Sequence, residues 1–187
     1  MYGAIIIGGS AGSFKIISQV ITSLPVDFPI PVIVCVHRLR NVKTGIIAAL
    51  SNNSSIKITE PSDKDSIEPG TVYIAPANYH LLIEHGNYFS LATSKPVNHS
   101  RPSIDIAMKS AAGAYSGSLA GILISGANSD GAEGMMAIHQ SGGTTIVQDP
   151  NEAEIPSMPE AAIDSYQPDY VYNTDKIINF IGKLTSS

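Results

Sequence analysis

The sequence has few of the residues that mark disulfide-bonded, membrane-spanning or nucleic-acid-binding proteins. It has no tryptophan and one cysteine, Cys35, so a disulfide within one chain is excluded. Cys35 lies in a β-branched run and is expected to be a buried core residue. Only 14% of the residues are charged and the net charge is −5. The largest basic cluster is His37-Arg38-Leu39-Arg40, so we expect no nucleic-acid partner.

Long apolar segments are also missing. No apolar run approaches the roughly 20 residues of a membrane-spanning helix, so we expect no membrane insertion. A strand pattern follows Met1 almost at once, which leaves no room for a signal peptide and favours a cytoplasmic protein. With 187 residues, of which 43% are hydrophobic, the chain can bury a full core. Without a linker, a repeat or a low-complexity tract, we expect one domain over residues 1–187.

Strand-like apolar runs alternate with helical patterns along the chain. We expect strands over Ala4–Ile7, Pro31–Val36, Ile56–Thr59, Val72–Ala75, Leu81–Glu84, Phe89–Ala92, Leu119–Ser125, Thr144–Gln148 and Tyr170–Tyr172. We expect helices over Ser13–Ser23, Lys43–Ser51, Ser103–Ser116, Ala132–Ser141 and Asp175–Lys183, with Pro102 in the first turn of the third. This alternation predicts an α/β fold. The expected architecture is a three-layer α/β/α sandwich around a mostly parallel, doubly wound sheet, with a β-hairpin insertion at Leu81–Ala92.

The segment from Ile5 to Gly12 ends an apolar strand in glycines on both sides of Ser10. Glycines around a serine allow a sharp turn from strand to helix, which exposes the hydroxyl above the sheet edge. The same pattern also fits a glycine-rich phosphate loop at the first strand–helix junction. That alternative is weaker, because the segment lacks a full Gly-x-Gly-x-x-Gly fingerprint and a lysine.

A serine, a histidine and an aspartate follow three of the expected strands. Ser10 follows the first strand, His37 closes the second, and Asp130 comes just after Leu119–Ser125. Open parallel sheets bind ligands outside the carboxyl ends of their strands. We therefore expect Ser10 as nucleophile, His37 as base and Asp130 as the group that orients the imidazole. The order serine, histidine, acid differs from that of α/β-hydrolases, so a different fold is expected to carry this chemistry.

Each of these residues also has a purely structural interpretation. Ser10 could cap the following helix, His37 could be a satisfied polar residue at a strand end, and Asp130 could cap the helix Ala132–Ser141. Three independent structural explanations would have to hold together at one sheet edge. We therefore favour the catalytic interpretation.

Other titratable residues are weaker candidates. His99, beside Arg101, is the reserve base, and Asp149 is the reserve acid. Asp105 is expected to be a solvated or capping carboxylate on its helix. No cluster of cysteine and histidine has metal-ligand spacing, so we expect no metal site.

The chain resembles the catalytic domain of the chemotaxis receptor methylesterase (CheB) family over nearly its whole length. The matching segments are Gly8–Gly12, the strand ending in His37, Ala75–Leu81, Arg101–Asp105, Gly126–Gly134, Gly142-Gly143, Gln148-Asp149 and Ser157–Ala162. The resemblance implies an α/β/α sandwich and a Ser/His/Asp triad at Ser10, His37 and Asp130. It also implies hydrolysis of glutamate methyl esters on the cytoplasmic helices of chemoreceptors, with release of methanol. Some members of the family also deamidate receptor glutamines. The resemblance implies no metal or organic cofactor, because water deacylates the enzyme.

The sequence departs from the family pattern at three loops. Arg38–Arg40 replaces a segment that usually contains a proline, Ala127-Asn128 replaces methionine–glycine, and Ala11–Ser13 replaces threonine–glycine–glycine. Backbone amides near Ala11 or Ala127 can still form an oxyanion hole. The family's frequent receiver domain is not in the sequence, so we expect constitutive activity or regulation by a separate response-regulator protein. The alternative function is a non-catalytic module that binds receptors or signalling partners.

Overall fold

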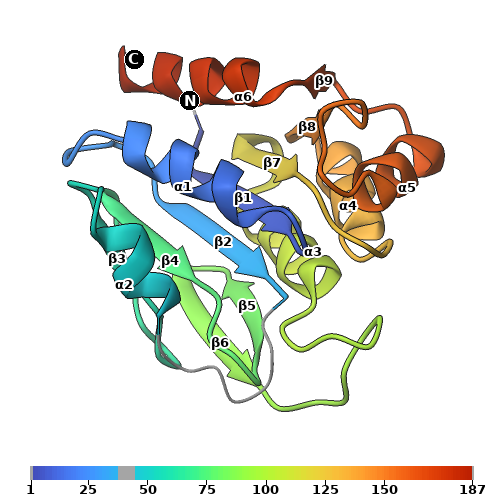
Figure 1. Ribbon diagram of the computed structural model, residues 1–187. Helices are drawn as coiled ribbons and strands as arrows, with labels where there is room; N and C mark the ends of the chain where they lie inside the picture. Colours follow the sequence, from blue (N-terminus) through green and yellow to red (C-terminus); the bar gives the residue numbers. More distant parts are fainter. Residues whose placement is uncertain (1, 38–44, 187) are drawn as a thin grey trace.

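The computed structural model describes residues 2–37 and 45–186, and its centre is a seven-stranded sheet (Figure 1). All its neighbouring strands are parallel, in the order β3-β4-β2-β1-β7-β8-β9. The strands are β1 Ala4–Gly9, β2 Val32–Val36, β3 Lys57–Thr59, β4 Thr71–Ile74, β7 Leu119–Leu123, β8 Thr144–Gln148 and β9 Tyr170–Tyr172. A separate antiparallel hairpin consists of β5 His80–Glu84 and β6 Tyr88–Ala92.

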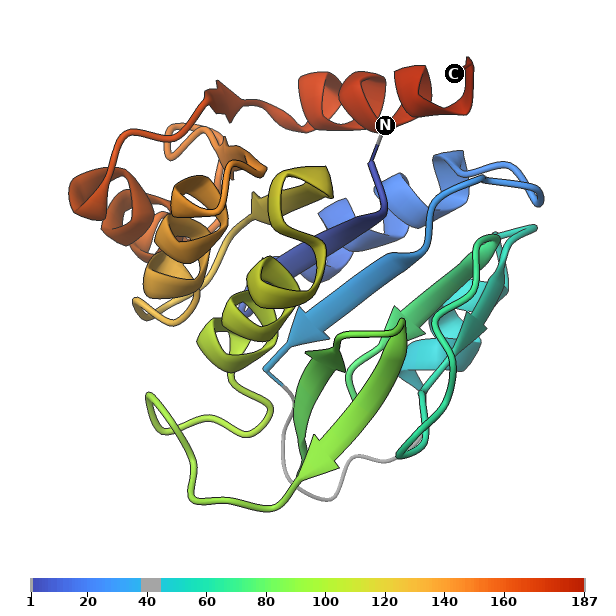
Figure 2. The same ribbon diagram turned by 180° about the vertical axis from the view of Figure 1, so that it is seen from behind.

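Helices cover both faces of the sheet. The helices are α1 Phe14–Ser23, α2 Ile46–Ser51, α3 Ile104–Tyr115, α4 Ala132–Gln140, α5 Ser157–Ser165 and α6 Thr174–Gly182, with short 3-10 helices η1 Ser116–Ser118 and η2 Lys183–Ser186. Buried side chains of α1, α2 and α6 join one hydrophobic cluster, whereas those of α3, α4, α5 and the hairpin join another. Figure 1 shows α1 and α2 in front of the sheet, and Figure 2 shows α3, α4 and the hairpin on the other side. The predicted three-layer sandwich with a hairpin insertion is therefore confirmed.

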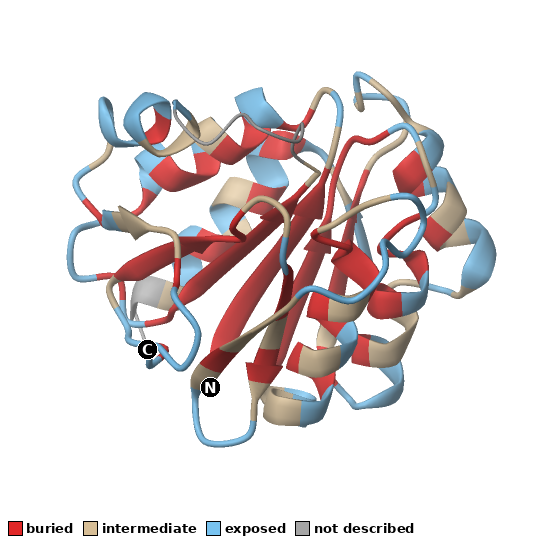
Figure 3. Ribbon diagram, turned by 90° about the horizontal axis from the view of Figure 1, so that it is seen from below, coloured by how far each residue is buried: buried red, intermediate tan, exposed pale blue. Residues whose placement is uncertain are grey.

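The central strands are apolar along their whole length because both of their faces are covered. Every residue of β1, β2 and β7 is buried, and Figure 3 shows this buried sheet between the partly exposed helices. Successive side chains of a strand point to opposite faces. Accordingly, Ile5 and Ile7 contact the α1 side, whereas Ala4 and Ile6 contact the α3 side. We propose that residues 1–187 form one domain, because both clusters pack on one continuous sheet.

The expected elements differ from the structure in a few places. Helix α5 was not expected, because Pro159 interrupts its helical pattern; the proline fits there because the first-turn N–H groups of a helix have no intrahelical partner. Pro102 lies outside α3, before its N-cap residue Ser103, rather than in the first turn. Of the expected helix Lys43–Ser51, the first two residues lie outside the described part, and α2 begins at Ile46. The other elements begin and end within two residues of the expected positions.

The chain order reverses at the centre of the sheet, between β1 and β7. From β1 the chain leaves through α1 on one face, whereas β7 is entered through α3 and left through α4 on the opposite face. The loops after these two neighbouring strands therefore leave toward opposite faces, which is the arrangement at which open parallel sheets bind ligands. Ser10 and Asp130 lie on these two loops. Within residues 2–37 and 45–186, no helix is long and apolar enough to cross a membrane.

Candidate active site

Ser10 lies in a tight turn between β1 and α1. Its N–H donates to the carbonyl oxygen of Ser125 (2.9 Å), and its own carbonyl accepts from the N–H of Ser13 (3.1 Å) and from the Ser13 hydroxyl (2.6 Å). Gly12 has φ +79°, and a Cβ there would lie 2.7 Å from Ser125 Oγ, so this position requires glycine. The N-cap residue of α1 is Ser13, whereas the Ser10 hydroxyl lies 3.1 Å from His37 Nδ1. The helix-capping interpretation of Ser10 is therefore wrong.

His37 joins the other two members of the candidate triad. It follows β2 directly, and its side chain is 13% exposed. Its Nδ1 lies 3.1 Å from Ser10 Oγ, and its Nε2 lies 2.7 Å from Asp130 Oδ2. An ionised carboxylate only accepts hydrogen bonds, so we assign the proton of the neutral imidazole to Nε2. The lone pair of Nδ1 then faces the Ser10 hydroxyl, which is the arrangement that a general base requires.

The carboxylate of Asp130 is completely buried, with 0% of the residue exposed. Burial alone would raise its pKa, but hydrogen bonds, first among them those from His37 and Asn98, outweigh this effect and lower the pKa to about 2. Within the described residues it has five donors. His37 Nε2 at 2.7 Å and Ile104 N at 2.8 Å donate to Oδ2, and Asn98 Nδ2 at 3.0 Å, Ser103 Oγ at 3.0 Å and Asp105 N at 3.1 Å donate to Oδ1. The carboxylate is thus anionic over the whole neutral range.

Asp130 sits on the N-terminus of α3 and not, as its capping interpretation required, on that of α4. The backbone N–H groups that it accepts from belong to the first residues of α3, Ile104 and Asp105. The N-cap residue of α4 is Gly131, whose φ is +100°. The positive end of the α3 dipole therefore adds to the stabilisation of the Asp130 anion.

Asp105 is a buried carboxylate, so the prediction of a solvated side chain is wrong. The alternative prediction, a capping carboxylate, is right, but Asp105 caps α4 and not its own helix α3. Only 3% of the residue is exposed, and its Oδ1 accepts from the N–H groups of Gly131 (2.9 Å) and Gly134 (2.8 Å) at the start of α4. Burial, followed by the nearby negative charge of Asp130, raises the pKa of Asp105. Asp105 of α3 thus caps α4, while Asp130, which precedes α4, caps α3.

The reserve candidates lie away from the Ser10–His37 pair. His99 is exposed and has φ +62°, and the structure shows no contact of its ring with the candidate triad. Asp149 accepts from both the backbone and the side-chain nitrogen of Asn151, each at 2.9 Å, which closes a local turn. The sequence interpretation missed Asn98 and Ser103 as partners of Asp130. Ser103 lies in the motif Arg101–Asp105, which the sequence analysis singled out. Nothing in the sequence pattern indicated that this motif would contact Asp130.

Backbone amides near Ser10 are candidates for holding an oxyanion. The N–H groups of Ser10 and Gly126 are occupied, since the latter donates to Ile155 O at 3.1 Å. Those of Ala11 and Ala127, both exposed residues, have no acceptor within the described part of the chain. The family departure at Asn128 is accommodated without strain, because Asn128 does not adopt a positive φ. The departure from the family pattern at Arg38–Arg40 lies outside the described residues.

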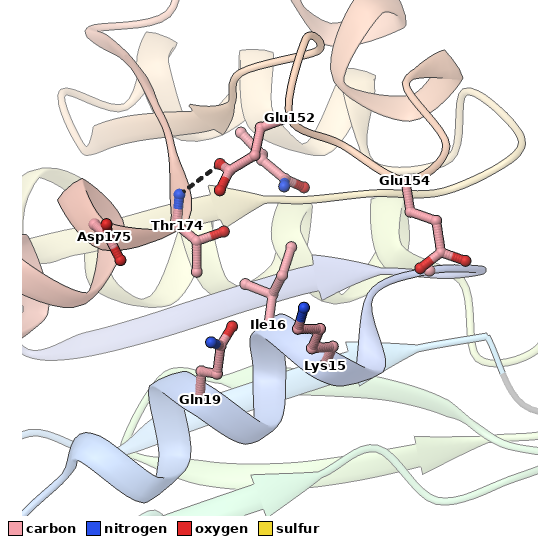
Figure 4. Close-up of a pocket in the computed structure, with 9 residues that line it drawn as sticks. Lys15, Ile16, Gln19, Glu152, Glu154, Thr174 and Asp175 are labelled. Atoms are coloured by element: carbon pink, nitrogen blue, oxygen red, sulfur yellow. Dashed lines mark hydrogen bonds between the residues drawn. The ribbon is translucent and has the colours of Figure 1, made fainter.

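A polar pocket of about 260 Å³ lies beside α1, next to the turn that contains Ser10 and Gly12 (Figure 4). Gly12 is the one residue of that loop that lines it, and none of the three triad candidates does. Its side chains include Lys15 of α1, Glu154 and Glu152. Glu152 Oε2 accepts from the N–H of Thr174 at 2.7 Å and so caps α6, as Figure 4 shows. Among the described residues there is no group of three or more metal-ligating side chains.

Comparisons with known proteins identify relatives over almost the whole chain. The model of the CheB methylesterase family matches residues 5–181. A protein of Leptospira interrogans serovar copenhageni, called a putative protein-glutamate methylesterase/protein-glutamine glutaminase, is 41% identical over 98% of this chain and 95% of its own length. A protein-glutamate methylesterase/protein-glutamine glutaminase of Thermotoga maritima is 30% identical over 92% of this chain, which corresponds to 51% of that relative. The chain thus spans about half the length of this second relative.

A solved structure shares the fold described above. It is the crystal structure of the Thermotoga maritima CheB methylesterase catalytic domain, with a TM-score of 0.93 and 29% sequence identity. The match covers 98% of this chain and 99% of that one. This agreement extends to the sheet, the flanking helices and the hairpin, and it confirms the fold that the sequence predicts.

Proposed function

The chain belongs to the CheB methylesterase family, and on that premise we propose that it is a serine esterase that hydrolyses glutamate methyl esters on the cytoplasmic helices of chemoreceptors. The observation that carries the proposal is the position of His37, which lies within hydrogen-bond distance of both Ser10 Oγ (3.1 Å) and Asp130 Oδ2 (2.7 Å). The names of the relatives support the ester and amide of a glutamate side chain as substrates.

In the proposed mechanism, Ser10 Oγ attacks the ester carbonyl carbon while His37 Nδ1 accepts the hydroxyl proton. The anionic Asp130 stabilises the imidazolium that forms, because the Nε2–H remains hydrogen-bonded to Oδ2. We propose that the N–H groups of Ala11 and Ala127 hold the tetrahedral oxyanion, since both are unoccupied and next to the nucleophile turn. Each such donor is typically worth about 3 kcal/mol in the transition state.

The intermediate collapses when His37 returns the proton to the leaving methoxide oxygen, which departs as methanol. Water, deprotonated by the same imidazole, then attacks the acyl-serine. The imidazolium returns this proton to Ser10 Oγ as the acyl group leaves, and the product acid ionises to the glutamate carboxylate by losing its own proton to solvent. The same sequence of steps serves a glutamine side chain, because the imidazolium can protonate the departing nitrogen and release ammonia. No step requires a metal or an organic cofactor.

The test is methanol release from a methylated chemoreceptor cytoplasmic fragment, with ammonia release from an unmethylated, glutamine-containing fragment as a second arm. Ser10→Ala is expected to lower the rate by on the order of 10⁶-fold, as is typical for loss of a serine nucleophile. Ser129→Ala is the control, because Ser129 is an exposed serine beside Asp130. If the wild type releases neither product, or if both variants retain the wild-type rate, the proposed function is wrong.

A further inference from the structure

One of the five donors to Asp130 comes from a segment that does not belong to the triad or to a helix. Four donors belong to His37 or to the first residues around the start of α3. The fifth is the side-chain amide of Asn98, which lies in the long loop between β6 and α3 and donates to Asp130 Oδ1 at 3.0 Å. Figure 1 shows this loop projecting from the body of the molecule beside the start of α3. Asn98 therefore reaches back from an exposed loop into the buried carboxylate site.

Asn98 bridges two carboxylates. The same nitrogen, Nδ2, also donates to Asp105 Oδ2 at 2.8 Å. A side-chain amide nitrogen carries two hydrogens, so each carboxylate receives one of them and the donor capacity of Nδ2 is used completely. Because Asp130 is a buried anion, its hydrogen bond from Asn98 is charge-assisted, which makes it stronger than a neutral one. The amide plane, and with it the Oδ1 side of Asp130, is thereby fixed.

Asp105 holds the other side of this arrangement. Its Oδ2 binds Asn98, while its Oδ1 accepts from the N–H groups of Gly131 and Gly134, the first of which directly follows Asp130 in the chain. Asp105 thus fixes both the amide that contacts the Asp130 carboxylate and the backbone that carries it. No contact joins Asp105 directly to Ser10 or His37 within the described residues, so any effect on the reaction passes through Asp130.

The loop that carries Asn98 does not need the Asn98 amide to hold it in place, because two other side chains already anchor it. Arg101 Nη1 donates to the carbonyl oxygens of Thr93 (2.8 Å) and Ser94 (2.9 Å). The buried His80 contacts Lys95 O through Nε2 at 3.1 Å. The backbone at Asn98 has φ +49°, which asparagine tolerates, and its turn is closed by the N–H of Val97 donating to Ser100 O (3.1 Å) and the N–H of Ser100 donating to Val97 O (2.8 Å), so the turn forms without the amide.

We propose that Asn98 and Asp105 are positioning residues for the reaction: the Asn98 amide, held by Asp105, keeps the Asp130 carboxylate oriented so that Oδ2 faces His37. This inference rests on the proposed function, because orientation of Asp130 matters only if His37 acts as the base. The competing interpretation is purely structural, with Asp105 as a cap for α4 and Asn98 as a loop contact. That interpretation predicts changes in stability without changes in the chemistry at His37.

The test compares Asn98→Ala, Asp105→Asn and the double variant for ester hydrolysis. Asn98→Ala removes one charge-assisted donor from Asp130, so kcat is expected to fall about tenfold with little change in KM. The acidic limb of the kcat/KM profile is expected to move to higher pH, because a carboxylate with fewer donors holds the adjacent imidazolium more strongly. Asp105→Asn places an amide NH₂ opposite the NH₂ of Asn98 and is expected to cause a similar loss, which the double variant does not increase.

A second readout does not depend on the substrate. The downfield proton NMR signal of the His37 Nε2–H···Asp130 hydrogen bond is expected to shift or broaden in Asn98→Ala. Asn151→Ala is the matched control, because Asn151 is also a loop asparagine that donates to a single aspartate, and it is expected to leave rate and signal unchanged. Asn98→Ala keeps the test decisive if Asp105→Asn fails to fold, because Asn98 is exposed.

The outcomes separate this inference from the proposed function. If wild type hydrolyses the ester, Ser10→Ala does not, and Asn98→Ala keeps the wild-type kcat, pH profile and NMR signal, the positioning role is wrong and the esterase stands. Additive losses in the double variant that follow stability alone would also contradict it. If the wild type is inactive on the ester, the proposed function fails, and the NMR comparison still decides whether Asn98 orients the His37–Asp130 pair.

Discussion

Replacement of Asp130 by asparagine offers a sharp test of the candidate active site. The new side chain must place an NH₂ group where one of two acceptor oxygens stood. At the Oδ1 position this group would face three donors, from Asn98, Ser103 and Asp105. At the Oδ2 position it would face the N–H of Ile104 and the Nε2 of His37. The second placement displaces fewer donors, so we expect it.

With the amide NH₂ at the Oδ2 position, the imidazole must change its tautomer. Nε2 then accepts a hydrogen bond from the amide, so the ring proton moves to Nδ1, the atom that lies 3.1 Å from Ser10 Oγ. A protonated Nδ1 cannot remove the hydroxyl proton. The analogous change in a serine protease triad lowers kcat about 10⁴-fold, which corresponds to about 5.5 kcal/mol of activation free energy. We expect a loss of this order for Asp130→Asn.

The assay is ester hydrolysis at neutral pH, with thermal unfolding to verify that the variant is folded. Asp149→Asn is the matched control, because Asp149 also follows a strand at the same sheet edge, but among the described residues its carboxylate accepts only from Asn151 in its own turn. We expect the control to keep the wild-type rate. A loss of less than tenfold in folded Asp130→Asn, or an equal loss in the control, would refute the assignment of Asp130.

Two further predictions concern stability around the same carboxylates. The folded pKa of Asp130, about 2, lies below its ordinary value of 3.8, so its contribution of about 2 kcal/mol is present above pH 4 and disappears as the pH falls toward 2. Urea unfolding between pH 5 and 2.5 is expected to show this slope in wild type and not in Asp130→Asn; equal slopes would contradict it. In Gly134→Ala the new Cβ would lie 2.6 Å from Met108 Cβ and 3.3 Å from Asp105 Cα, so α3 and α4 must separate, at about 1–3 kcal/mol. Gly113→Ala, with nothing within 4 Å, is its control, and equal unfolding free energies for the two would refute the packing argument.

Local patterns in the sequence were sufficient to predict the sheet and the glycine-flanked turn that carries Ser10. The buried strands are continuous apolar runs, and the turn at Ser10 needs glycine at a nearby position with positive φ, so both features depend on neighbouring residues alone. The positions of His37 and Asp130 at the same edge as Ser10 followed from the general rule for parallel sheets. Helix α5 was missed because Pro159 concealed a helical pattern that tertiary packing stabilises.

Only the tertiary structure decided which groups surround the catalytic candidates. Asp130 lies one residue before the N-cap of α4 in the chain, yet its carboxylate caps α3, and Asp105 of α3 caps α4 in return. These pairs are separated by about 25 residues, and their contact depends on how two helices cross, which periodicity along the chain does not encode. The bridge through Asn98 depends on the path of a loop with a left-handed backbone. The sequence by itself determined the strands and the sheet edge at which Ser10, His37 and Asp130 lie, whereas long-range packing determined the hydrogen bonds between them.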